Sequence, residues 1–220
     1  MAIVVYNRLA NLQAWFACWQ KAPHREAKLL VIHNYDGHAP DPRYQEVSTG
    51  NCDWYVARPN KGFDSGSFQD LCLDRLPGWT YAQWPWDALL WVVDDTLPLQ
   101  KDFLQPFFSK LFWNPAIGLM CSHLSDEHSL HARTNCFCLR HEDAIHLKFP
   151  KKVIRTKEDC YEFEHRGVST LTKQIQRLGL KVVQVSEGIA DTMWDTGHYA
   201  HLNRWSTLHE TFPATQEFVP

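Results

Sequence analysis

The chain has 220 residues, of which 45% are hydrophobic and 21% charged, a composition ordinary for a globular protein with a real core. Its net charge of −3 provides no basic field for nucleic acid, and no apolar run is long enough to span a bilayer. The seven cysteines are an odd number without a Cys-x-x-Cys pair, which argues against a disulfide framework and a structural zinc site. Because the first residues lack the basic flank of a secretory signal, we expect a cytoplasmic protein with reduced thiols.

The beginning of the chain has a strand–helix–strand pattern. Apolar residues 3–6 predict a strand, residues 9–21 repeat apolar side chains at helical spacing, and residues 28–33 predict a second strand. This order is the unit of a parallel sheet with a right-handed crossover. The following residues 37–53 are rich in Pro, Asp, Gly and Asn and predict a loop.

A short third strand, predicted over 54–57, leads into a segment rich in small and polar residues. We expect a helix from Ser67 to about Leu76. Gly62 and Gly66 allow the backbone to approach a ligand or adopt a positive φ, and the amino end of a helix offers N–H groups to anions. Their spacing alone is weak evidence for a nucleotide site, because it matches neither the dinucleotide fingerprint nor a P-loop.

The centre of the chain carries five apolar residues, Leu89–Val93, followed by the adjacent carboxylates Asp94 and Asp95. This pattern predicts a buried strand whose carboxyl end lies where open α/β sheets hold their ligands. Adjacent carboxylates repel each other, and a hard divalent cation that also holds substrate phosphates would bridge them. The alternative is that both residues merely end the strand and cap a helix that starts near Lys101.

The second half of the chain continues this alternation. Strands are predicted over 116–121, 135–139 and 181–185, and helices over about 101–112, 141–147 and 168–178. The polar residues 122–134 predict a loop, and residues 164–167 are expected to interrupt a charged segment that begins at Thr156. The last 35 residues show little periodicity, and we expect them to lie back over the sheet.

Ten tryptophans are an unusual number for this length, and several fall within residues 79–86. Aromatic clusters usually belong to a core. Flat rings also stack on the faces of sugars, so the sequence leaves both interpretations open.

The order of motifs in the middle of the chain resembles a known family. The relevant residues are Asn60–Phe63, Gly66 with the helix after it, Leu89–Val93, Asp95–Thr96 and Pro98. They are similar to the pattern of nucleotide-sugar glycosyltransferases of the GT-A fold, especially glycosyltransferase family 2 and its rhamnosyltransferase-like members. Weaker similarity extends from Ala2 to about Val185.

This resemblance implies a single α/β domain with a mostly parallel central sheet flanked by helices. Residues 1–100 would form the nucleotide-sugar-binding half, residues 101–185 the acceptor and catalytic half, and residues 186–220 a C-terminal tail. A chain of this length is also compatible with one part of a larger multidomain glycosyltransferase.

The resemblance implies a metal site as well. Asp95, with Asp94 beside it, would match the family's Asp-x-Asp site, which coordinates the Mn²⁺ or Mg²⁺ that bridges the diphosphate. In several GT-A enzymes a late histidine completes the metal shell, and His198 and His201 are the candidates here.

The same comparison implies residues that hold the nucleotide sugar. Asn7 and Arg8, after the first strand, and Asp36, after the second, would contact the nucleotide. The residues expected to line the nucleotide or sugar side of the cleft are Asn60, Lys61 and Asp64. Alternatively, Asp36 is only a turn residue and Lys61 only a solvated side chain.

Inverting members of the family need a general base that takes the proton of the acceptor hydroxyl. Two acids match the family's position before a helix that ends in glycine, Asp159 and Glu164. The spacing back from Gly179 favours Glu164, and His165 is placed to tune it. A solvated charged loop is the alternative for both.

Together these features predict transfer of a hexose or deoxyhexose from a UDP- or dTDP-type nucleotide sugar to a hydroxyl of a glycan or glycoconjugate, with inversion favoured. A non-catalytic GT-A-like domain that binds sugar or a partner chain is the main alternative. A phosphotransfer receiver is disfavoured, because receivers carry their acid pair on the first strand of a chain about half as long.

Overall fold

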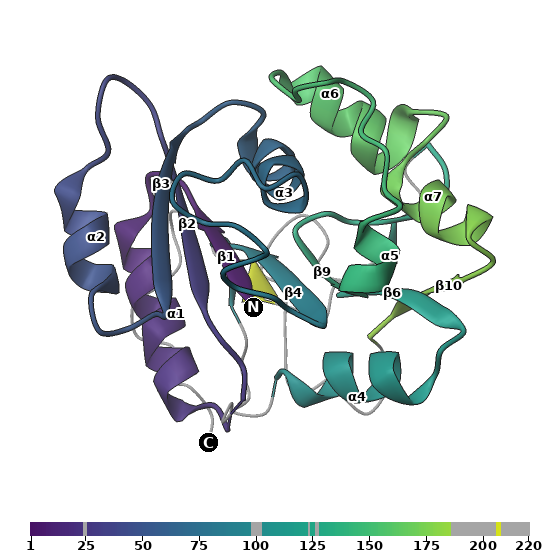
Figure 1. Ribbon diagram of the computed structural model, residues 1–220, viewed down its shortest axis with the longest axis horizontal. Coiled ribbons are helices and arrows are strands. Elements are labelled where there is room, and N and C mark those ends of the chain that lie inside the picture. Colours follow the sequence, from purple (N-terminus) through teal and green to yellow (C-terminus); the bar gives the residue numbers. More distant parts are fainter. Residues whose placement is uncertain (24–25, 98–102, 123, 126–127, 186–205, 208–220) are drawn as a thin grey trace.

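The computed structural model describes residues 1–23, 26–97, 103–122, 124–125, 128–185 and 206–207 (Figure 1). Within these ranges no helix combines the length and the apolar character that crossing a bilayer requires. One seven-stranded sheet organises the fold, in the order β10-β6-β9-β4-β1-β2-β3. Its strands are β1 (Ala2–Val5), β2 (Leu30–Tyr35), β3 (Trp54–Pro59), β4 (Ala88–Val93), β6 (Ile117–Cys121), β9 (Cys136–Arg140) and β10 (Lys181–Gln184).

The sheet is parallel except for β9, which is antiparallel to both of its neighbours, β4 and β6. The mostly parallel α/β architecture predicted from the sequence is therefore confirmed. Alternate side chains of β1 face opposite sides of the sheet: Ile3 and Val5 belong to one core, and Ala2 and Val4 to the other. A sheet that is buried on both faces requires such continuous apolar strands.

Helices cover both faces of the sheet and complete three layers (Figure 1). The core on one face is closed by α1 (Leu9–Lys21), α2 (Pro42–Ser48) and α4 (Gln105–Trp113). The core on the other face is closed by α3 (Phe63–Cys72), α5 (His141–Ala144), α6 (Lys157–Tyr161), the π-helix η1 (Glu162–Arg166) and α7 (Leu171–Arg177). All seven cysteines are free, as their odd number and spacing predict.

Two helices differ from the expectation. The predicted loop over 37–53 contains α2, because Asp41 accepts a hydrogen bond from Arg43 N at 3.0 Å and Pro42 occupies the first helical turn. Helix α3 begins at Phe63, four residues before the predicted start at Ser67. The helices predicted over 101–112, 141–147 and 168–178 exist as α4, α5 and α7 with different bounds.

The sequence predicts that residues 164–167 interrupt a charged segment, but residues 164–166 continue α6 as the π-helix η1, and the helical run ends only at Gly167. Gly167 N donates to Glu162 O at 3.0 Å, an i→i−5 bond. A Cβ at Gly167 would lie 2.2 Å from that same oxygen, so this closure requires glycine. The wider turn buries Glu164 and His165, and such turns recur at functional sites.

Two short strand pairs complete the described structure. The predicted loop over 122–134 contains an antiparallel pair, β7 (Leu124–Ser125) with β8 (His131–Ala132). Directly after Asp95, β5 (Thr96–Leu97) pairs antiparallel with β11 (Ser206–Thr207). The remainder of the predicted tail, 186–205 and 208–220, lies outside the described residues.

His33 makes the folded state sensitive to acid. Its ring is buried, stacks on Tyr44 at 3.9 Å and hydrogen-bonds the Tyr55 hydroxyl at 2.7 Å. Burial lowers the pKa of His33 from 6.5 to about 4, so the unfolded chain binds a proton here in the window between these values while the folded chain does not. This site should therefore cost about 2 kcal/mol of unfolding free energy on going from pH 7 to pH 5.

Urea unfolding of the parent and of His33→Phe at pH 7 and pH 5 checks this. We expect the variant to lose less stability over this pH range than the parent. Equal losses would show that His33 does not contribute.

Candidate active site

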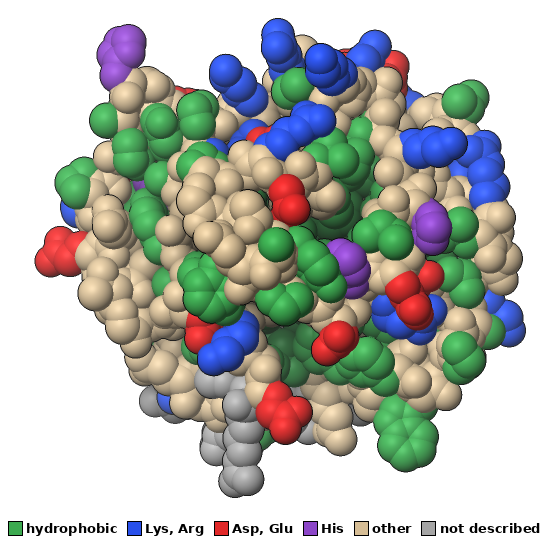
Figure 2. All heavy atoms as spheres, viewed as in Figure 1, with side chains coloured by type: hydrophobic (Ala, Val, Ile, Leu, Met, Phe, Trp, Pro, Cys, Tyr) green, Lys and Arg blue, Asp and Glu red, His purple; other side chains and the backbone are tan. Residues whose placement is uncertain are grey.

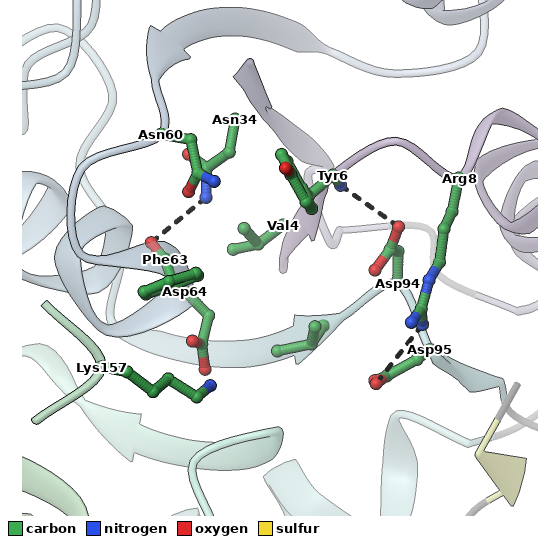
Figure 3. A pocket seen from close by; sticks show the side chains of 11 residues that line it. Val4, Tyr6, Arg8, Asn34, Asn60, Phe63, Asp64, Asp94, Asp95 and Lys157 are labelled. Atoms are coloured by element: carbon green, nitrogen blue, oxygen red, sulfur yellow. Dashed lines mark hydrogen bonds and ion pairs between the residues drawn. The ribbon is translucent and has the colours of Figure 1, made fainter. Parts of the chain in front are cut away.

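A pocket of about 140 Å³ opens at the carboxyl ends of β1, β2 and β4, against the amino end of α3 (Figure 3). This is the sheet edge at which parallel α/β folds place ligands. Its polar walls include Tyr6, Arg8, Asn34, Asp64, Asp94 and Asp95.

Asp94 and Asp95 form the turn that follows β4. Asp94 is 3% exposed; its N–H donates to Val4 O at 2.9 Å, and its Oδ2 accepts a hydrogen bond from Tyr6 N at 3.2 Å. Burial and the adjacent Asp95 carboxylate raise the pKa of Asp94 to about 8. The strand pairing of β4 with β1 thus holds two neighbouring carboxylates at the pocket, where a positive group would relieve their repulsion.

Arg8 supplies part of that positive charge. Its Nη1 lies 3.5 Å from Asp95 Oδ2, and both side chains are about one-third exposed, at 38% and 32%. A partly exposed ion pair of this kind contributes about 1 kcal/mol or less. An incoming cation or diphosphate can therefore displace it at little cost.

The wall opposite Asp94 carries Asp64 and Lys157, whose charged ends lie next to each other in Figure 3. Burial raises the pKa of Asp64 to about 6, against the lowering effect of Lys157, and Glu164 adds to the rise. Glu164 is 8% exposed and sits behind this wall on η1, where it accepts a hydrogen bond from Thr134 N at 3.1 Å. The pocket thus has carboxylates on two sides and a cation on each.

Glu164 also pairs with Arg133, whose Nε lies 3.4 Å from Glu164 Oε1. The next residue, His165, has its ring centroid 5.1 Å from that of His131. His131 is fully buried, so two buried imidazoles lie beside this carboxylate, and the tuning of Glu164 by His165 stays a prediction.

A buried arginine fixes the loop that forms the rim. Arg58 donates to Asn34 Oδ1 at 2.9 Å and to Lys61 O at 2.9 Å, and it pairs with Asp70 at 2.7 Å. Asn34 in turn donates to Phe63 O at 3.1 Å. This network connects the end of β2 to the loop between β3 and α3, so buried hydrogen bonds fix the position of the pocket rim.

Gly62 allows this loop to pass close to the segment before α6. Its φ is +73°, and a Cβ there would lie 2.2 Å from Ile154 O. The predicted positive φ at Gly62 is confirmed, whereas its approach to a ligand stays a prediction; the close contact seen here is with protein backbone.

The structure brings together five of the residues predicted for the site: Arg8, Asn60, Asp64, Asp94 and Asp95 all line the pocket. Three others lie nearby on the surface. Asn7 is exposed with φ +52°, Asp36 is exposed and accepts a hydrogen bond from the Tyr6 hydroxyl, and Lys61 is exposed.

The two predicted base residues differ in their surroundings. Asp159 forms a capping box with Thr156 at the start of α6, where its Oδ2 accepts hydrogen bonds from Arg155 N and Thr156 N. These bonds lower its pKa.

Two sets of predictions fall outside the described residues. They are the candidate metal ligands His198 and His201, and the start of the helix near Lys101 that Asp94 and Asp95 would alternatively cap, because residues 98–102 are not described.

Sequence reasoning missed three polar residues that line the pocket: Tyr6, Asn34 and Lys157. Tyr6 and Asn34 follow or end predicted strands, so their position at the sheet edge could have been inferred from strand polarity. Lys157 reaches the pocket from a helix far along the chain, and no local pattern indicates that contact.

The oxygen atoms at this pocket fit a hard divalent cation whose coordination shell is completed by a bound ligand. Among the residues that the structure describes, no three His, Cys, Asp or Glu side chains cluster as a complete metal site. Asp94 and Asp95 offer carboxylate oxygens, and Mg²⁺ often binds through one or two carboxylates with phosphate and water filling the other positions.

This chain is similar to known proteins in its fold but not in its sequence. No protein-family profile matches the chain, and no curated protein sequence matches it significantly. The crystal structure of glucosyl-3-phosphoglycerate synthase from Mycobacterium tuberculosis, in complex with Mn²⁺, UDP and phosphoglyceric acid, matches with a TM-score of 0.55 and 13% identity. The match covers 83% of this chain and 66% of that chain, so this chain spans slightly less than two thirds of the synthase.

Two nucleotidyltransferases also match. A cytidylyltransferase from Leptospira borgpetersenii has a TM-score of 0.54 at 12% identity, covering 85% of this chain and 75% of its own. CMP:2-keto-3-deoxy-manno-octonic acid synthetase, complexed with CTP, has a TM-score of 0.50 at 8% identity, covering 83% and 87%. At these identities the likeness shows the fold, which is that of the GT-A-type nucleotide-diphospho-sugar transferases.

Proposed function

We propose that this chain is a metal-dependent glycosyltransferase that transfers a hexose or deoxyhexose from a UDP- or dTDP-type nucleotide sugar to a hydroxyl of a glycan acceptor. The observation that carries the proposal is the buried Asp94 beside Asp95 at the carboxyl edge of the parallel sheet, within one pocket that also holds Arg8 and Lys157. The synthase of similar fold was crystallised with Mn²⁺ and UDP, which supports the same ligand class here.

Asp94 and Asp95 would hold Mn²⁺ or Mg²⁺, with His198 as a further candidate ligand. When bound, the ion would neutralise the charge that grows on the departing diphosphate. Arg8 is placed to follow the diphosphate, because its pairing with Asp95 is weak and half-exposed. Lys157 provides a second cation on the opposite wall.

The nucleoside would lie toward β1 and β2. Asp36 and Tyr6, joined by a hydrogen bond at the lip of the pocket, are placed to accept from a pyrimidine N–H or a ribose hydroxyl. Asn60 lines the same side, while Asn7 and Lys61 flank it from the surface.

The acceptor would enter on the side of Asp64 and Glu164. In transfer, the acceptor oxygen forms a bond to the sugar anomeric carbon while the bond from that carbon to the phosphate oxygen breaks. The electron pair leaves with the diphosphate, and the acceptor proton passes to a carboxylate. We assign that role first to Glu164 and second to Asp64, which lines the pocket directly; direct displacement of this kind inverts the anomeric centre.

A non-catalytic domain that keeps the fold and binds a sugar or partner remains the second candidate. The Arg8–Asp95 ion pair favours it, because that contact partly satisfies the carboxylate without a metal. The division of the chain at residues 100 and 185, the cytoplasmic location, membership in family 2 and a role in polysaccharide biosynthesis all stay predictions.

A thermal-shift panel of UDP, dTDP, GDP and CDP, each with and without Mn²⁺, tests the proposal. We expect a pyrimidine diphosphate to raise the unfolding temperature only when Mn²⁺ is present. A ligand at a hundred times its dissociation constant adds about 2.7 kcal/mol of stability.

Turnover separates the two candidates. Release of UDP from UDP-sugars in the presence of the shifting metal supports the enzyme, whereas binding without turnover supports the non-catalytic domain. Absence of any metal-dependent shift would contradict both the metal site and the donor.

A further inference from the structure

A second cavity, of about 400 Å³, lies at the other end of β4 from the candidate active site. Its walls include Tyr81, Trp86, Asp87, Phe112, Arg140 and Glu142. The six residues of β4 begin beside this cavity and end immediately before Asp94, so about 20 Å of strand separates the two sites. On the face seen in Figure 2, hydrophobic, acidic, basic and histidine side chains lie together over the region of α5.

Two aromatic walls of this cavity, Tyr81 and Trp86, pack against each other and against His141. Tyr81 stacks on His141 with centroids 3.8 Å apart and planes 7° from parallel. Trp86 meets the same imidazole edge-on at 4.8 Å, and Phe112 is 55% exposed at the end of α4. Rigid, partly exposed rings of this kind provide flat apolar contact surfaces at low entropic cost.

The tryptophans of residues 79–86 have different surroundings in the structure, and their stacking on sugars stays a prediction. Trp79 is 3% exposed and belongs to the core. Trp86 lines the cavity. The cluster thus divides between packing and a surface that a ligand can reach.

The cavity is lined by two carboxylates, Asp87 and Glu142, and by one cation, Arg140, so its net charge is slightly negative. Burial lowers the pKa of His141, which favours the neutral form of its ring. Arg140 is committed internally: its Nη1 donates to Leu111 O at 2.9 Å, its Nη2 to Ile117 O at 2.7 Å, and its Nε pairs with Glu142 at 3.0 Å. Phosphates, nucleotides and acidic lipid headgroups are therefore disfavoured.

We propose that this cavity binds a neutral sugar unit of a glycan, as a carbohydrate site separate from the donor pocket. A pyranose ring presents apolar C–H faces that pack on aromatic rings, and hydroxyls that donate to carboxylates such as Asp87 and Glu142. Because the cavity lies at the opposite edge of the sheet, it would hold a part of the glycan remote from the site of transfer. The binding itself does not depend on the proposed donor or metal.

Calorimetric titration of the full chain with maltohexaose, cellohexaose and mannohexaose, without nucleotide or metal, tests the proposal. We expect saturable binding of at least one hexamer. Phe112→Ala and Glu142→Gln should each weaken it about tenfold, equivalent to about 1.4 kcal/mol. The matched control is Trp113→Ala, since Trp113 is an adjacent aromatic that is 87% exposed and does not line the cavity.

The outcomes separate this site from the donor site. No binding of any hexamer, binding unchanged in Phe112→Ala, or displacement of the hexamer by UDP with Mn²⁺ would each overturn the proposal. Binding of a lysine-rich peptide without binding of a hexamer would overturn it in favour of a cationic partner. Failure of the nucleotide panel alongside normal hexamer binding would instead reject only the donor site.

Discussion

Asp95→Ala is expected to abolish Mn²⁺-dependent stabilisation by a nucleoside diphosphate and to lower sugar transfer about 10³-fold, equivalent to about 4 kcal/mol of transition-state stabilisation. The physical reason is that the substitution removes one of the two carboxylates proposed to hold the ion, together with the ion pair that Asp95 forms with Arg8 at 3.5 Å. The matched control is Glu158→Gln, which removes an exposed carboxylate of α6 that pairs with Arg166. Unchanged metal-dependent binding in Asp95→Ala would show that the acid pair has no role in holding the ion.

A paired measurement separates binding from chemistry. Glu164→Gln should keep the thermal shift with UDP and Mn²⁺ while transfer falls about 10²- to 10⁴-fold, because a general base acts on the acceptor and not on the donor. Asp64→Asn is the comparison, since Asp64 lines the pocket and Glu164 lies behind it. A larger loss of transfer in Asp64→Asn than in Glu164→Gln would move the base to Asp64.

Gly62→Ala is expected to destabilise the fold by about 2–5 kcal/mol, the sum of a left-handed backbone penalty and an overlap with backbone. The added Cβ would lie 2.2 Å from Ile154 O, and that backbone oxygen cannot move away by a side-chain rotation. Gly179→Ala is the matched control, because Gly179 has a similar φ of +77° but no atom within 4 Å of its Cβ position.

Urea unfolding of both variants tests this difference. Gly179→Ala should cost only about 1–2 kcal/mol, the backbone penalty alone. Equal destabilisation by the two substitutions would mean that the close approach of Gly62 to residue 154 contributes nothing, and that the pocket rim tolerates a wider loop.

Much of the sheet could be predicted because its strands are buried on both faces and therefore appear as continuous apolar runs, such as Leu89–Val93. The acid pair after that run could be placed at the ligand edge by the same reasoning. The direction of β9 could not, because an antiparallel strand inside a parallel sheet has the same apolar pattern as its neighbours.

The rest of the site depends on contacts between distant parts of the chain. Lys157 enters the pocket because the segment just before α6 lies against Gly62, at the amino end of α3. The burial of Glu164 follows from the π-helical turn closed by Gly167, which a helical periodicity of 3.6 residues does not indicate. Helix α2 could have been predicted, because the Asp41-Pro42 capping signal is present in the sequence within the segment expected to be a loop.

The position of β4 between β1 and β9 has a consequence for the order of folding. Ala2 pairs with Trp91, and Asp94 N–H bonds to Val4 O, so the acid pair is anchored only when strands nearly half the chain apart have met. Pairings of such large sequence separation carry a high loop-closure cost and form slowly. During synthesis, β1 and β2 can associate early, but the carboxylates that define the donor pocket take up their positions only after β4 has emerged and joined the first strand.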